Sequence, residues 1–595
     1  MTEADLRSYY ESRRAEFSRQ LDAVKENIKV ISHWRLGVAS IFLLLLYLGW
    51  SSTSVLYLLI IPAGLFLYFV QRHSRLFEHK RHLEDLVRIH QSELEGLDGN
   101  YSSFDAGTEF IDVHHAFTHD LDVFGDGSLF QALNRCSTRG GKKALASRLS
   151  SLMQSPAAIV EYQHAVSDVA SKSDFRHEIQ ARGMRVEEFE DDRRQLREWV
   201  MHPAFLYGKG LYHIALVVFP VITIVLLVLA FVLDGIAPFF WLAFALQWGF
   251  LAAHLKRINE FHQYISRKKN LFAKYGFLLK AIDEQPFDSA LMKRLSGQAR
   301  DAHKKLSALA SMVGSLDARL NSLMTLVVNG VFLYDMQFVY RLERWKEDNA
   351  GKLEMWLETI EEVEVVCSFG TFTFNNQVFV FPTINETGRL KAGEIAHPQI
   401  GAGERVSNDL HIDREHSIMI ITGANMAGKS TFLRTIGVNV LLALNGAPVC
   451  AKAMDCPVIE MRSGMRTADS LRDHQSYFYA ELHRLQSIIT DLKAGKQLLI
   501  LLDEILKGTN STDKQAGSIA LVRQLLTYPA LVAVATHDLV LGNMENEYPE
   551  KIRNFSFEAS IAGDQLLFDY KLKRGVASKM NATFLMEKMG IIPRK

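Results

Sequence analysis

Two long stretches without charged side chains place the strongest constraint on how this 595-residue chain can fold. The first runs from Leu36 to Val70 and is interrupted only by the small polar segment SSTS. The second consists of Leu211 to Leu233 and Ile236 to Leu255, which are separated only by a turn at Asp234-Gly235. Soluble helices rarely stay apolar and uncharged beyond about 18 residues. We therefore predict two helical hairpins with four transmembrane helices; core helices of a soluble protein are the weaker alternative.

Basic residues flank both hairpins, whereas the turns inside them carry none. The flanking residues include Arg13, Arg14, Arg19, Lys25, Lys29, Arg35, Arg72, Arg75, Lys80, Arg81, Lys209, Lys256 and Arg257. By the positive-inside rule this predicts an integral membrane protein with both termini in the cytoplasm. The predicted partner is a lipid bilayer, as in a bacterial inner membrane.

The remaining composition excludes several classes of protein. Lys plus Arg equals Asp plus Glu at 67 each, so no overall basic field favours nucleic acid. Four scattered cysteines without a C-x-x-C pair exclude a disulfide framework and a zinc ribbon. Before the first hairpin, an apolar stripe from Phe17 to Ile31 at 4-3-4-3 spacing predicts a helix that packs within the chain rather than a dimerisation zipper.

The C-terminal part carries a predicted nucleotide site. An apolar strand at 417–422 precedes GANMAGKS, and a helical pattern follows from Thr431. In such a strand, loop and helix, the backbone N–H groups and the helix N-terminus hold phosphates, the lysine adds a charge and the serine binds Mg²⁺. We predict ATP and Mg²⁺ as cofactors. The predicted binding residues are Gly423, Ala424, Asn425, Met426, Ala427, Gly428, Lys429, Ser430 and Thr431.

Two further apolar strands end in polar residues that suit phosphoryl transfer. Strand 498–502 is followed by Asp503 and Glu504, and strand 530–535 by Thr536 and His537. We predict that Asp503, with Ser430, binds the metal, and that Glu504 positions the attacking water. His537 is predicted to sense the γ-phosphate, and Lys429 completes the catalytic set.

These motifs together resemble the MutS family of ABC-type ATPases. The likeness is carried by TGANMAGKSTFLRTIG at 422–437, DEILKGTNSTDKQAG at 503–517, ATHD at 535–538 and YKLKRGVASKMNATFLMEKMG at 570–590. A weaker likeness begins at Phe117 and covers the family's helical core. The resemblance implies a homodimer with composite ATP sites, in which Ser476 of one subunit faces the partner's γ-phosphate. It also places Arg405 where the family has an aromatic residue that stacks on adenine.

The predicted fold class is an α/β P-loop ATPase of the MutS C-terminal type, preceded by an all-α core-like region that transmembrane hairpins interrupt. No counterpart of the family's mismatch-reading domain is recognised. The predicted segments are a cytoplasmic helix (1–35), hairpin 1 (36–70), a second cytoplasmic helix (71–100), a core-like region (101–210), hairpin 2 (211–255), a helical core and lever (256–365) and the ATPase domain (366–595).

Three functions remain open at this point. The resemblance implies a membrane-anchored ATPase coupled to mismatched or structured DNA, and twelve Lys or Arg against five Asp or Glu between Lys256 and Lys305 fit that role. The same cluster also fits anionic lipid. The alternative is a membrane mechanochemical or tethering ATPase without nucleic acid. A transporter is the weakest, because no LSGGQ motif occurs and the spans offer no polar path.

Overall fold

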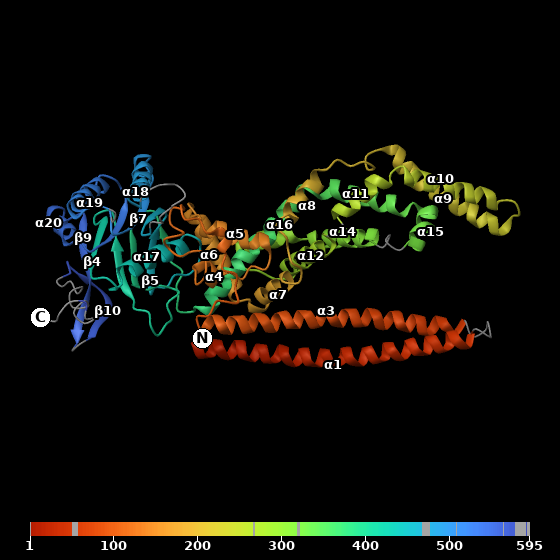
Figure 1. Cartoon of the computed structure of the whole chain (residues 1–595), viewed down its shortest axis with the longest axis horizontal. Helices are drawn as coiled ribbons and strands as arrows, with labels where there is room; N and C mark the ends of the chain where they lie inside the picture. Colours follow the sequence, from red (N-terminus) through yellow and green to blue (C-terminus); the bar gives the residue numbers. More distant parts are fainter. Residues whose placement is uncertain are drawn as a thin grey trace.

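The computed structural model describes residues 2–49, 57–265, 268–317, 322–466, 477–506, 509–562, 565–577 and 591. A mixed α/β region forms one end of the molecule and a helical region continues from it (Figure 1). Two helical arms leave the helical region in the same direction, with their tips farthest from the α/β region. The predicted order, helical first and α/β second, is confirmed.

The first arm is an antiparallel pair of long helices, α1 (Glu3–Gly49) and α3 (Ile60–Leu97). Leu21 and Val24 of α1 bury against Leu83 of α3, and Phe17 and Ile28 pack beside them. This confirms packing of the apolar stripe within the chain. Both helices run without a break through the boundaries predicted at 35/36 and 70/71, and the segment boundaries themselves stay predictions.

The base of the first arm is tied to the helical region by a buried polar network. Arg135 Nε donates to Glu93 Oε1 at 2.5 Å, and Asn375 Nδ2 donates to Glu93 Oε2 at 2.8 Å. The Tyr10 hydroxyl donates to Asn375 Oδ1 at 2.7 Å. Because each group is satisfied, this network fixes where the arm meets the end of helix α16.

The helical region surrounds α16 (Tyr334–Asn375), which runs from the second arm to the α/β region. The other helices are α4 (Leu129–Leu133), α5 (Arg139–Leu149), α6 (Pro156–Ala170), α7 (Ser173–Gly183), α8 (Asp192–Met201), α11 (Leu255–Ile265), α12 (Lys269–Glu284), α13 (Ala290–Ala299), α14 (Ala302–Asp317) and α15 (Ser322–Phe332).

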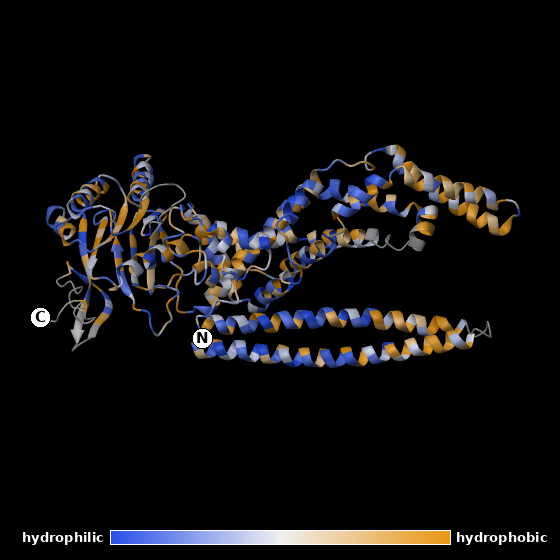
Figure 2. Cartoon of the chain, viewed as in Figure 1, coloured by the Kyte–Doolittle hydropathy of each residue, from blue (hydrophilic) through white to orange (hydrophobic). Residues whose placement is uncertain are grey.

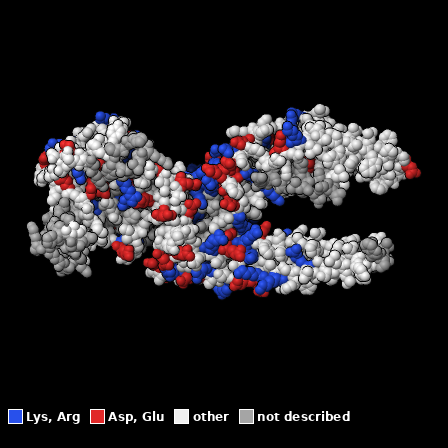
Figure 3. Space-filling view, in the orientation of Figure 1, with Lys and Arg blue, Asp and Glu red and all other residues white. Residues whose placement is uncertain are grey.

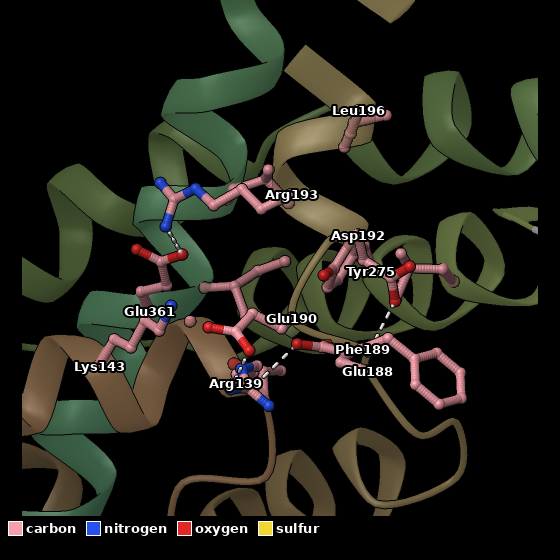
Figure 4. Close-up of a pocket in the computed structure, with 15 residues that line it drawn as sticks. Arg139, Lys143, Glu188, Phe189, Glu190, Asp192, Arg193, Leu196, Tyr275 and Glu361 are labelled. Atoms are coloured by element: carbon pink, nitrogen blue, oxygen red, sulfur yellow. Dashed lines mark hydrogen bonds and ion pairs between the residues drawn. The ribbon is translucent and has the colours of Figure 1, made fainter. Parts of the chain in front are cut away.

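Close packing of α5 on α16 depends on Gly140 and Gly141, because a Cβ atom at either would lie within about 2.2 Å of the Glu361 or Glu364 side chain. Beside this contact lies a small cavity of about 50 Å³. Figure 4 shows charged residues of α5, α8 and α16 around it, with Arg193 reaching Glu361 at 2.5 Å. Ion pairs therefore hold these helices together where apolar packing ends.

The second arm contains α9 (Gly210–Val232) and α10 (Ala237–Ala252), joined by a turn at Gly235 with φ +90°. The two apolar helices predicted on either side of this turn are present, their crossing of a membrane stays a prediction, and α15 packs along them. A Cβ atom at Gly330 of α15 would overlap the Phe244 ring, and Trp248 Nε1 donates to the Leu326 carbonyl at 3.1 Å. The sequence analysis had assigned this apolar helix only to the lever.

Of the four predicted spans, two lie in helices long and apolar enough to cross a membrane, α1 and α9, judged by length and composition over the described residues. Helices α10 and α11 would make a third if the 60° bend between them lies within one span. Helix α3 is not among these candidates. Its apolar part ends at Val70, close to Arg72, and residues 50–56 before it are outside the described part. Both arms are most apolar at their tips (Figure 2).

The α/β region contains two sheets. One has the order β1-β5-β2-β3, from β1 (Thr383–Asn385), β2 (Leu390–Ile395), β3 (Asn408–Ile412) and β5 (Ala453–Pro457). The other has the order β10-β9-β4-β8-β7-β6, from β4 (Ile418–Gly423), β6 (Glu460–Gly464), β7 (Leu498–Asp503), β8 (Leu531–Thr536), β9 (Ile552–Ala562) and β10 (Gln565–Arg574). Helices α17 (Lys429–Ala443), α18 (Tyr477–Lys493), α19 (Ser511–Leu525) and α20 (Met544–Glu547) complete it.

The junction between the two regions is centred on the Asp120 carboxylate, which is fully buried. It accepts hydrogen bonds from the Ser463 hydroxyl at 2.7 Å and from the Arg466 backbone N–H at 2.9 Å, both at the end of β6. The Arg484 guanidinium of α18 lies 2.8 Å from it. One carboxylate thus joins the N-terminal part of the chain to a strand and a helix of the α/β region.

We expect Asp120→Asn to destabilise this junction by about 3 kcal/mol, because it leaves a partly buried guanidinium without its counter-charge. The measurement is the midpoint of thermal unfolding of the purified full chain. The matched control is Asp126→Asn, an exposed residue nearby, which should leave the midpoint unchanged. Equal midpoints for the two variants would contradict the assignment.

Candidate nucleotide-binding site

The large sheet brings the three predicted motifs to one edge. Strands β4, β8 and β7 are adjacent and parallel, so their carboxyl ends lie together. The register pairs Thr422 with Thr536 and Asp503 with Ala535. The loop after β4, the acidic pair after β7 and the histidine after β8 therefore meet at one place, as the sequence analysis predicted.

The loop between β4 and α17 has the conformation that a phosphate loop requires. Gly423 has φ +150° and Gly428 has φ +106°, and Met426 also lies in the left-handed region at φ +66°. A Cβ atom on Gly423 would lie 2.4 Å from the Phe557 carbonyl oxygen. The glycines at the two ends are therefore required by the backbone, and Gly428 is the N-cap of α17.

Lys429 lies in the first turn of α17 and is 5% exposed. Its Nζ donates to the carbonyl oxygens of Gly423 at 2.9 Å and Ala424 at 2.8 Å. The ammonium is thus folded back under the loop, beside the surface where phosphate oxygens would lie. Carbonyl contacts hold the cation in this place while the loop N–H groups remain available to an anion.

The predicted metal ligands are in contact. The Ser430 hydroxyl donates to Asp503 Oδ2 at 2.5 Å, and Asp503 Oδ1 is buried without a hydrogen-bond partner among the described residues. A hydroxyl next to a carboxylate with an unsatisfied buried oxygen suits Mg²⁺, a hard cation that prefers oxygen and retains waters. The residues fit the ion.

Glu504, predicted to position the attacking water, is in contact with His537, predicted to sense the γ-phosphate. Glu504 Oε1 lies 2.7 Å from His537 Nε2, and the Glu504 backbone N–H donates to the Ala535 carbonyl at 2.8 Å. Glu504 has φ +54°, an unfavourable conformation for a glutamate. The backbone at the end of β7 therefore directs the Glu504 side chain toward β8 rather than into solvent.

A cavity of about 470 Å³ opens above the loop. Glu504, His537, Asn425, Met426, Lys429, Ser430 and Thr431 line it, together with residues that the sequence analysis did not single out, chiefly His397, Phe432, Phe557 and Tyr570. Tyr570 lies 3.2 Å from the position of a Cβ atom on Gly428 and stacks with Phe568. The sequence signal that could have identified Tyr570 was its position in segment 570–590, which resembles the MutS family.

His397 adds a neutral donor or acceptor to this cavity. Burial, together with the nearby Arg434, lowers the pKa of its imidazole to about 4. The ring is therefore uncharged at neutral pH and adds no repulsion or attraction toward a phosphate.

Arg405 lines the same cavity, in the place that the resemblance gives to adenine stacking. Its guanidinium lies 5.3 Å from the centre of the Phe379 ring, and Nη1 donates to Cys450 Sγ at 2.8 Å. One face of the guanidinium is thus already covered by an aromatic ring. The role of Arg405 toward a base stays a prediction.

Other predicted residues lie outside the described part. Ser476 of the signature loop and Gly508 of the loop after β7 are among them, as are 578–590 of the C-terminal segment. Asn510 is described and caps α19, with its side chain accepting from the Asp513 N–H at 2.9 Å.

The fold and this arrangement define a P-loop domain of the α/β class. Comparison with known proteins narrows the class, because residues 419–594 match the family model of MutS domain V. The DNA mismatch repair protein MutS of Thermotoga neapolitana is 32% identical over 231 residues, which is 38% of this chain and 28% of that protein. The namesake protein of Listeria monocytogenes is 30% identical over 239 residues, 39% of this chain and 27% of that protein.

The similarity to the MutS family is thus established for the C-terminal part of the chain, residues 419–594. The matches span under a third of the length of these curated relatives.

We expect Gly423→Ala to disturb the loop, because the added Cβ atom meets backbone rather than a flexible side chain. The loop should shift. We expect the free energy of unfolding to fall by about 2 kcal/mol and the protein to retain less nucleotide. Chemical unfolding and filter binding of ATP measure the two. Gly393→Ala in β2 is the control, since its Cβ would meet nothing within 4 Å. Normal nucleotide retention by the Gly423 variant would contradict this role for the loop.

Proposed function

We propose that this chain is a membrane-anchored MutS-family ATPase that hydrolyses ATP at a site shared between two copies, and that its helical region binds DNA. The observation that carries the proposal is the meeting of the phosphate loop, the Ser430–Asp503 pair and the Glu504–His537 pair at one cavity. Family membership supports ATP hydrolysis, since the MutS family consists of ATPases.

The residues divide the reaction between them. Lys429 and the N-terminus of α17 hold the β- and γ-phosphates, and Ser430 with Asp503 would hold Mg²⁺, which neutralises charge on the phosphates. Glu504 orients the attacking water and accepts its proton, and His537 fixes the position of the Glu504 carboxylate through their 2.7 Å contact. Ser476 of the second copy completes the site, by analogy with the family.

Membrane anchoring is supported by exposed apolar surface at the arm tips. Leu43 and Leu44 of α1 are 64% and 57% exposed, and Phe231 of α9 is 87% exposed. Contiguous apolar surface of this extent marks a contact with lipid or protein. The tips of both arms lie at the same end of the molecule, so one bilayer can receive both (Figure 2).

Figure 3 shows Lys, Arg, Asp and Glu side chains over the helical region and the inner parts of the arms, and almost none at the tips. Charge therefore changes to apolar surface along each arm, as it does where a protein enters a bilayer. A cytoplasmic position of both termini follows from the basic flanks.

We expect Glu504→Gln to lower ATP turnover about 100-fold or more while ATP stays bound, because the amide cannot accept the water proton. Phosphate release and ATP retention by the detergent-purified protein measure the two effects. Glu550→Gln, an exposed residue of the same domain, is the matched control. Turnover unchanged by Glu504→Gln would refute the proposed role of this carboxylate.

The nucleic-acid part of the proposal has its own test. We expect duplex or mismatched DNA to change the ATPase rate, and the apparent affinity to fall steeply between about 50 and 200 mM salt, because phosphate contacts release counterions. The assay compares both DNAs at two salt concentrations, with polyglutamate as the polyanion control. If DNA does not change the ATPase rate at low salt, the DNA-binding part is contradicted and the alternative, a tethering ATPase without a nucleic-acid ligand, is favoured.

A further inference from the structure

A cavity of about 560 Å³, separate from the nucleotide site, lies at the base of the second arm. Helix α8, the segment 202–209, helix α11 and helix α16 enclose it. Its lining is mainly apolar and aromatic, with cationic side chains: Trp199, His202, Pro203, Ala204, Phe205, Lys209, Arg257, Glu260, Phe261, Tyr264, Glu343 and Lys346. This size and character suit an amphipathic ligand.

The cavity wall is held in place by two buried charged residues of α16. The Glu343 carboxylate accepts the backbone N–H groups of Phe205, Leu206 and Tyr207 at 2.8–2.9 Å. Lys346 Nζ donates to the His202 carbonyl. Because both side chains bind the same connecting segment, the wall is formed before any ligand arrives.

Trp199 forms part of the cavity wall. The indole ring is 4% exposed and stacks on Trp345 with ring centres 6.2 Å apart. Its Nε1–H is buried and has no hydrogen-bond partner among the described residues. Trp199 therefore contributes aromatic surface to the cavity wall, and the charge in the lining comes from other residues.

The charge around the cavity favours an anion. Lys209 and Arg257 are exposed and neither forms an ion pair within the described part of the chain, although Lys209 Nζ lies 5.9 Å from the Tyr212 ring centre. The lining contains two carboxylates, Glu260 and Glu343. Glu343 accepts hydrogen bonds from three backbone N–H groups, so Glu260 is the negative charge that opposes these cations.

The cavity also lies where the charged surface at the base of the second arm changes to apolar surface. Lys209 directly precedes α9, and Arg257 follows the end of α10, so both cations flank the base of the apolar hairpin. Leu211 and Ile214, in the first turns of α9, are 79% and 60% exposed. A molecule with a charged group in the cavity could therefore extend an apolar chain along α9.

We propose that this cavity binds the headgroup of an anionic phospholipid. The phosphate pairs with Lys209 and Arg257, while the acyl chains lie on the exposed face of α9. Basic pockets at the cytoplasmic side of membrane helices recognise lipid headgroups through this combination of charge and apolar surface. The inference rests on the membrane anchoring proposed above.

The test measures retention of tritiated phosphatidylglycerol and phosphatidylcholine by the full chain purified in detergent. We expect the wild type to prefer phosphatidylglycerol, and Lys209→Gln with Arg257→Gln to lower that preference about tenfold. The matched control is Arg75→Gln with Lys256→Gln, which removes the same charge beside the two hairpins but outside the cavity lining. Equal loss in both double variants, or no preference in the wild type, would overturn the proposal.

Competition separates the sources of phosphate. Glycerol phosphate and duplex DNA are added to the lipid-loaded protein at equal phosphate concentration, and we expect neither to displace the lipid. Displacement by either would reassign the cavity to a soluble phosphate or to nucleic acid. Carbonate extraction of membranes tests the anchoring separately: release of the chain would contradict the proposed anchoring, whereas the retention ratios report on the cavity alone.

Discussion

The buried carboxylate of Asp120 is the contact on which the arrangement of this molecule depends. It lies in the N-terminal half of the sequence, yet its partners are the end of β6 and Arg484 of α18. A buried carboxylate must be fully paired, so this contact permits one relative position of the helical and α/β regions. The P-loop helix joins the same place, because Arg434 Nε donates to the Asp120 carbonyl at 2.9 Å.

From this junction the long helix α16 extends toward the arms. Near its first turn, Gln337 Nε2 donates to the Leu216 carbonyl of α9 at 3.4 Å, which Pro220 leaves without a helical donor. Near its last turn, Asn375 binds Glu93 and Tyr10 at the base of the first arm. Helix α16 therefore contacts both arms and the core. It offers a direct mechanical connection from the ATPase domain to both arms.

The arms combine two kinds of surface that are usually separate. Their inner parts are joined by ion pairs and apolar stripes like a soluble bundle, and their tips expose large apolar side chains. The change occurs within single continuous helices, α1 being the longest. A cavity lined by aromatic and cationic side chains near such a boundary suits a lipid headgroup, which is the physical basis of the inference about the base of the second arm.

The sequence alone determined the nucleotide site well. Gly423, Lys429, Ser430, Asp503, Glu504 and His537 could be recognised because a strand followed by a glycine-bounded loop is a local pattern with a direct chemical use. The hairpin at 211–255 and the helix pair of the first arm were also recognisable, because apolar periodicity is local. Both kinds of prediction need only neighbouring residues.

Other features were decided only by tertiary structure, because they depend on residues far apart in the chain. Asp120 meets Arg484, Tyr570 meets Gly428, and Trp199 meets α11 and α16 through folding that no local pattern encodes. Two or three of the four predicted spans correspond to candidate helices among the described residues, and the number of spans stays a prediction. Local patterns determine elements and motifs; long-range packing determines which side chains share a site.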